Sequence, residues 1–102
     1  MKGFEKQIAW ATDIQCNVTS ILSTAYIDCV EMGGDPRAAQ KIDRMCSAVK
    51  NAEYAGDIIE LFNGICVTGD KKRDFLNVVS RFKVSAPLTE GQRSILAAFK
   101  EV

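Results

Sequence analysis

Residues 4–32 read FEKQIAWATDIQCNVTSILSTAYIDCVEM, and this stretch decides the fold. At about 100° per residue from Phe4, its apolar side chains keep one helical phase without a break. The stripe covers an arc of about 140° and contains Ile8, Ala11, Ile14, Val18, Ile21, Leu22, Ala25 and Cys29. The pattern predicts one long helix that ends at Gly33-Gly34, because glycine adopts the left-handed cap conformation without a clash. Such a stripe must be covered by the rest of the chain or by a second copy.

Four shorter helices are predicted to fold back against this one. Asp35-Pro36 is a strong start signal, with aspartate as the cap and proline at the first helical position. The apolar phase jumps at Asn51, which we therefore expect to cap the next helix. Thr89 and Gln92 have the spacing of a capping box. The expected bounds are 36–50, 52–62, 70–84 and 89 to the end of the sequence.

The inward faces of these helices follow from the same periodicity. The expected core residues are Ala38, Ile42, Met45, Cys46 and Val49, then Ala55, Ile58, Ile59 and Phe62, then Phe75, Val78, Val79 and Phe82, and last Ile95, Leu96 and Phe99. Ile65-Cys66-Val67 is expected to be a buried loop, since a lone strand has no partner here. The prediction is a single all-α domain over residues 1–102, with about five helices packed on the N-terminal one.

Composition restricts the function. The chain has 13 basic and 13 acidic side chains and no histidine. Zero net charge disfavours a nucleic-acid coat, and the absence of histidine removes the commonest general base and metal ligand. The four cysteines have no zinc-like spacing, so we expect reduced, structural cysteines. We therefore expect no enzyme activity, no metal and no cofactor.

The N-terminal region bears on location. It lacks the apolar core of a secretory signal, because Thr12 and Asp13 interrupt the apolar run. The longest uncharged run, Ile14 to Ile27, is too short and too polar to span a bilayer. The sequence therefore predicts a cytoplasmic protein with no membrane partner.

Two charged stripes are candidates for partner binding. Their members are Arg37, Lys41 and Arg44 on the second helix, and Glu53, Asp57 and Glu60 on the third. In both stripes the spacing of i, i+4 and i+7 places the charges on one face, opposite the expected core. The stripes are either solvated faces or docking surfaces for a partner of opposite charge.

Other residues suggest alternative contacts. Trp10 lies at the margin of the apolar arc, as either a core edge or an interface anchor. Cys16 and Ile27 lie on the outer flank of the long helix, which is compatible with a homodimer through that helix. A third basic group could contact phosphates of DNA or RNA, although its members spread around the fourth helix; it comprises Lys71, Lys72, Arg73, Arg81 and Lys83.

Two segments carry a resemblance to a known class of proteins. Glu5-Lys6-Gln7, Trp10-Ala11 and Ile14 resemble the opening of small helical modules encoded by phages and other mobile elements. Asn51-Ala52 and Asp57-Ile58-Ile59-Glu60 resemble the later helix of such modules. Some small phage proteins of this kind are anti-CRISPRs, which block a host defence complex by binding it.

The resemblance implies a non-enzymatic inhibitor that occludes a host protein or ribonucleoprotein complex. The alternatives are a small DNA- or RNA-binding accessory protein and a structural helical homodimer.

Overall fold

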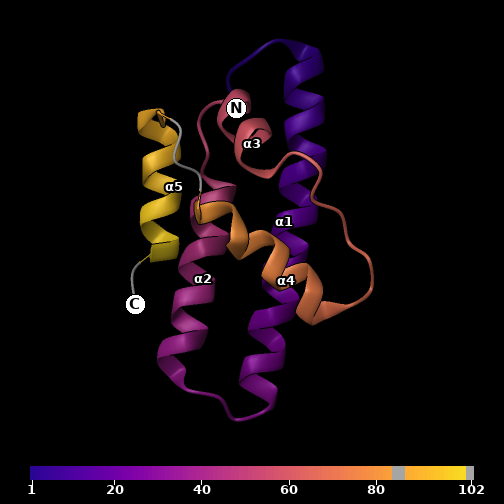
Figure 1. The fold of residues 1–102 in the computed structure, drawn as a ribbon, viewed down its shortest axis with the longest axis vertical. Coiled ribbons are helices and arrows are strands. Elements are labelled where there is room, and N and C mark those ends of the chain that lie inside the picture. The colour runs from indigo at the N-terminus through magenta and orange to yellow at the C-terminus, as the bar shows by residue number, and fades with distance from the viewer. Residues whose placement is uncertain (84–86, 101–102) are drawn as a thin grey trace.

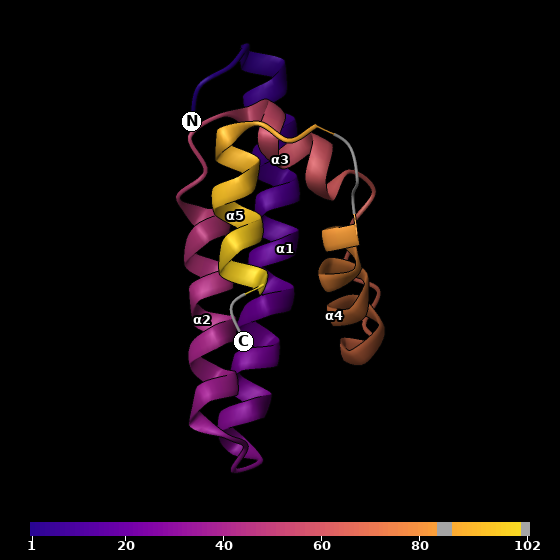
Figure 2. The ribbon, with the colours of Figure 1, turned by 60° about the vertical axis from the view of Figure 1, so that its left-hand side comes forward.

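The computed structural model describes residues 1–83 and 87–100, and it confirms the all-α fold (Figure 1). The elements are α1 (Glu5–Glu31), α2 (Pro36–Lys50), α3 (Ala55–Phe62), α4 (Lys71–Val79), the 3₁₀ turn η1 (Ser80–Lys83) and α5 (Glu90–Lys100). α1 and α2 form a long antiparallel hairpin, α4 crosses α1, and α5 lies along α2. Figure 2 shows α5 on one face of the hairpin, and the closed end of the hairpin projects beyond α5.

α1 is one continuous helix, as its unbroken apolar phase predicts. Ala11, Ile14 and Val18 are buried, as are Ile21 and Leu22 further along. The helix ends in a Schellman motif: the Gly33 N–H donates to the Val30 carbonyl and the Gly34 N–H to the Cys29 carbonyl. Gly33 has a φ of 68°, where a side chain would be strained.

Phe4 does not belong to the buried stripe. It is 79% exposed, because it is the N-cap and lies in an extended conformation outside the helical wheel.

α2 has the predicted bounds. Pro36 occupies its first turn, and the Asp35 Oδ1 accepts a hydrogen bond of 2.9 Å from the Arg37 N–H. The prediction of a buried Ala38 is wrong, since Ala39 is buried in its place. The start of α2 extends past α5 and lies beside α1 (Figure 1). The side of the helix that faces α1 is therefore the buried side there, and Ala39 lies on it.

α3 begins three residues later than predicted. The Lys2 N–H donates to the Glu53 carbonyl (2.7 Å), and the Ala55 N–H donates to the Lys2 carbonyl (2.9 Å). This bridge holds Tyr54 extended, with φ −117° and ψ 133°, so Asn51 ends α2 instead of opening α3. The sequence gives no local sign of a partner so distant along the chain.

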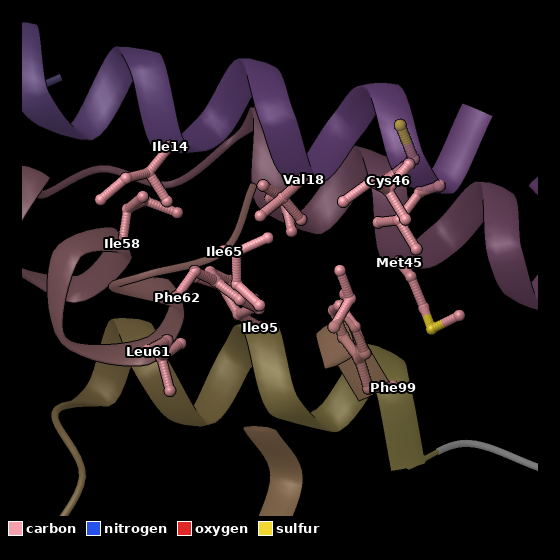
Figure 3. Close-up of a cluster of buried hydrophobic side chains, with 14 of the residues drawn as sticks. Ile14, Val18, Met45, Cys46, Ile58, Leu61, Phe62, Ile65, Ile95 and Phe99 are labelled. Atoms are coloured by element: carbon pink, nitrogen blue, oxygen red, sulfur yellow. The ribbon is translucent and has the colours of Figure 1, made fainter. Parts of the chain in front are cut away.

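The core lies where α1, α2, α3 and α5 meet (Figure 3). Phe62, from α3, is its largest fully buried side chain, and its ring centroid lies 6.2 Å from that of Phe99 in α5. Most of the predicted core is confirmed; Ile59, Phe75 and Val79 are only partly buried, and the side chain of Phe82 lies outside the described part of the chain. The predicted buried loop is confirmed only at Ile65, since Cys66 and Val67 are exposed. All four cysteines are free.

α4 begins within one residue of the predicted start, and Asp70 is its N-cap: the Asp70 Oδ1 accepts a hydrogen bond from the Arg73 N–H (3.1 Å). It ends at Val79 and continues as η1; the expected end at Val84 lies outside the described residues. Asp74 is only 3% exposed, which the sequence did not predict. Its carboxylate accepts hydrogen bonds from the Thr68 hydroxyl (2.6 Å) and the Thr68 N–H (3.0 Å), and so fixes the loop before the helix.

This contact predicts a dependence of stability on acid. The hydrogen bond from the Thr68 hydroxyl is the main cause that lowers the pKa of the Asp74 carboxyl, against the opposing effect of burial. A lowered folded-state pKa stabilises the fold above the ordinary pKa, and this stabilisation is lost as the pH falls through the lowered value. We expect the free energy of unfolding of Thr68→Val to fall less steeply than that of the parent protein as the pH is lowered through this range. Urea denaturation at a series of pH values measures the difference.

The control is Thr24→Val, because Thr24 has no side-chain hydrogen bond among the described residues. Thr24→Val should leave the dependence of the unfolding free energy on acid pH unchanged. If Thr68→Val also has the same dependence as the parent protein, the proposed role of the Thr68–Asp74 contact is wrong.

Candidate protein-binding surfaces

The basic stripe of α2 lies on the outside of the molecule. Arg37 and Arg44 are exposed, and Lys41 is half-buried. Their spacing places them on successive turns, over about 10 Å of helix length. The exposure of Arg37 and Arg44 agrees with the predicted position of this stripe away from the core.

The acidic stripe is exposed only at Glu53 and Glu60. Glu53 precedes α3 and forms an ion pair with the Lys2 Nζ at 3.1 Å. Asp57 is 5% exposed, and its Oδ1 accepts a hydrogen bond of 2.7 Å from the Thr89 hydroxyl. The Glu60 Oε2 accepts one of 2.7 Å from the Gln92 Nε2. The prediction of an outward position is therefore wrong for Asp57, and the three carboxylates do not form one continuous exposed face.

The physical reason is the capping of α5. The predicted capping box is confirmed: the Thr89 N–H donates to the Gln92 Oε1 (3.0 Å), and the Gln92 N–H donates to the Thr89 hydroxyl (3.1 Å). Asp57 adds a negative charge beside this helix start, where the helix dipole favours it. A sequence signal did exist, since Asp57 lies four residues before Leu61, which is buried and which the predicted core also omitted.

A hollow of about 600 Å³ lies beside this contact. Its lining includes Lys2, Tyr54, Asp57 and Glu90. The hydrogen bond from Lys2 to Glu53 raises the pKa of the Lys2 ammonium. Asp57 holds α5 against α3, so we assign it a structural role. Within the described residues there is no group of three side chains that could hold a metal ion.

Trp10 is 49% exposed and does not belong to the side chains that pack against the core. The interpretation of Trp10 as a core edge is therefore wrong. A half-exposed tryptophan is typical of interface anchors, since it offers a large area and one hydrogen-bond donor.

The third basic group is divided in space. Lys71, Lys72 and Arg73 are exposed in the first turn of α4, where the Lys71 Nζ lies 3.4 Å from the Asp28 Oδ1. Arg81 is half-buried in η1, with its guanidinium beside Gly64. The side chain of Lys83 lies outside the described part of the chain. Among the four described side chains of this group, Lys71, Lys72 and Arg73 lie together in one turn, and Arg81 lies apart in η1.

Sequence reasoning missed a groove between α1 and α2. Two hollows, of about 410 and 250 Å³, lie on either side of Tyr26. Both are lined only by α1, α2 and the turn between them, and Asp43 borders both. The exposed fractions of Tyr26, Ile27 and Val30 are 39%, 52% and 54%. The available signal in the sequence was the position of Ile27 on the outer flank of the long helix.

Comparisons with known proteins give no relative: no family model, no curated protein and no solved structure matches this chain. No helix of the described chain is both long and apolar enough to cross a membrane.

Proposed function

We propose that this protein is a non-enzymatic binding module that docks on a host protein or ribonucleoprotein through the basic stripe of α2. The observation that supports this proposal is the outward position of Arg37, Lys41 and Arg44. Of the acidic stripe, Asp57 is buried against Thr89, Glu60 accepts a hydrogen bond from Gln92, and Glu53 is paired with Lys2. A one-signed stripe on a rigid helix accelerates encounter with an acidic surface and sets its orientation.

The finer assignment follows the resemblance to small phage modules. We propose that the bound complex belongs to host defence and that occupancy of its acidic surface blocks it, as an anti-CRISPR does. The protein would then act in the cytoplasm of the host cell. Trp10 is a second anchor, on α1, for a partner large enough to reach it.

The test is a pull-down from host lysate with two variants that carry the same change of charge. In the first, Arg37, Lys41 and Arg44 are all replaced by glutamate; in the second, Lys71, Lys72 and Arg73 are. We expect the first variant to lose the retained complex, with a loss of affinity of about tenfold or more for three reversed contacts. The second variant should retain it. Circular dichroism checks that both variants are folded.

A parallel pull-down with nuclease distinguishes protein binding from nucleic-acid binding. The exposed basic turn at the start of α4 is the observation that favours nucleic-acid binding. Under that alternative nuclease removes the prey, and the α4 variant, not the α2 variant, loses binding. A complex that survives nuclease and binds both variants equally would contradict the basic stripe as the docking surface.

A further inference from the structure

The groove between α1 and α2 is a face without a partner inside the described chain. It is formed by two helices only, and α3, α4 and α5 contribute nothing to its lining. Three large apolar side chains, Tyr26, Ile27 and Val30, remain exposed on it. Exposed apolar side chains that cluster beside hollows mark an interaction surface.

The side chains along the α1 edge of this face change in size. Cys16, Ser23 and Val30 lie seven residues apart, and therefore point in nearly the same direction. The half before Ser23 carries small side chains such as Thr19, and the half after it carries the large ones. Two such edges packed antiparallel would place Val30 against Cys16 of a second copy, and Ile27 against Thr19, so that large side chains meet small ones.

The α2 edge has a matching pattern of charge. Asp43 and Lys50, also seven residues apart, are exposed, and neither side chain has an ion-pair partner among the described residues. The midpoint between them lies at Cys46 and Ser47. Antiparallel packing about that midpoint places Lys50 against Asp43 of a second copy, twice.

One two-fold axis can relate both the α1 edge and the α2 edge to the same edges of a second copy. The centre of the α1 pattern is Ser23, and the centre of the α2 pattern is next to Cys46. The Ser23 Oγ lies 3.9 Å from the Cys46 Sγ, so the two centres are at the same level of the hairpin. An isologous interface requires this kind of self-complementary patch.

We propose that this chain forms a two-fold homodimer through the α1–α2 groove, with the hairpins antiparallel about the Ser23–Cys46 contact. The zero net charge adds no long-range repulsion between copies. The interface leaves the basic stripe of α2 outside, so the inference does not depend on the proposed function.

The first test measures mass by light scattering and sedimentation equilibrium over rising protein concentration. The parent protein is expected to reach twice the mass of one chain. Ser23→Arg places a guanidinium at the axis and should raise the dimer dissociation constant by about tenfold to a hundredfold. The matched control is Asn77→Arg on the exposed side of α4, which adds the same charge and should leave the constant unchanged.

The second test addresses the register. Asp43→Lys and Lys50→Asp should each weaken the dimer, because like charges then face each other, and the double variant should restore it. In a Cys66→Ser background, Val30→Cys should give a disulfide-linked dimer on oxidation that also requires Cys16. Both experiments substitute exposed side chains, so the fold is retained.

Three outcomes would overturn the proposal. The first is a parent protein that stays monomeric at every concentration, which would leave this face to a different protein. The second is a dimer that Ser23→Arg does not weaken. The third is a double charge exchange that fails to restore association, or a disulfide that forms without Cys16.

Discussion

Replacing Phe62 by alanine is expected to lower the free energy of unfolding by about 3–5 kcal/mol, the range for a fully buried phenylalanine. Phe62 is 0% exposed and lies between α1 and α5, so no neighbouring side chain can move in from solvent to fill the cavity. Loss of the contact with Phe99 adds to the cost. Urea denaturation followed by circular dichroism measures the change.

A domain of this size has a total stability of roughly 5–15 kcal/mol, so Phe62→Leu is needed in case the alanine variant does not fold. It should cost about 1–1.5 kcal/mol, because the volume is largely kept. The control is Phe4→Ala, at a residue that is 79% exposed, where the change should stay within about 0.5 kcal/mol. Equal effects at Phe62 and Phe4 would show that α3 does not supply the centre of the core.

Two glycines at the same position of their helices are expected to respond to alanine with opposite signs. Gly56 and Gly91 are each the second residue, of α3 and α5. A Cβ on Gly56 would meet nothing within 4 Å, so Gly56→Ala should stabilise by up to about 1 kcal/mol through helix propensity. A Cβ on Gly91 would overlap the Asp57 Oδ2, and Gly91→Ala should destabilise by about 1–3 kcal/mol.

A double-mutant cycle identifies the cause of the second effect. Asp57→Ala removes the carboxylate that the new methyl group would strike, so Gly91→Ala should cost much less in that background. Thermal unfolding of the four proteins gives the coupling free energy. The same cost of Gly91→Ala in both backgrounds would mean that backbone conformation, and not the Asp57 contact, requires glycine there.

The helices could be predicted where a local pattern encodes them. The continuous phase of α1, the Asp35-Pro36 start and the Thr89–Gln92 capping box are all confirmed. The start of α3 was wrong because it depends on backbone bonds from Lys2, more than fifty residues earlier in the chain. Periodicity reports which residues share a face, but not which distant backbone competes for a cap.

The exposure of the candidate surface residues could likewise be predicted only where it depends on local spacing. Arg37 and Arg44 are exposed and Lys41 is half-buried, as their spacing within α2 predicts. Asp57 and Glu60 follow the same spacing, yet they serve the start of α5 and the Gln92 amide. The difference lies in the packing of α5 against α3, which no pattern within α3 reveals. Asp74 was missed for a related reason, since its partner Thr68 lies in a loop.

The hairpin of α1 and α2 also has a consequence for how the chain acquires this structure. The two helices are joined by a turn of only a few residues, so their packing closes a short loop at little entropic cost. α5 joins α2 and α3 only after tens of intervening residues have been ordered. The hairpin is therefore suited to form the folding nucleus, and core changes in it should slow refolding. Changes at Ile95 or Leu96 in α5 should chiefly accelerate unfolding, and so shorten the lifetime of the folded protein.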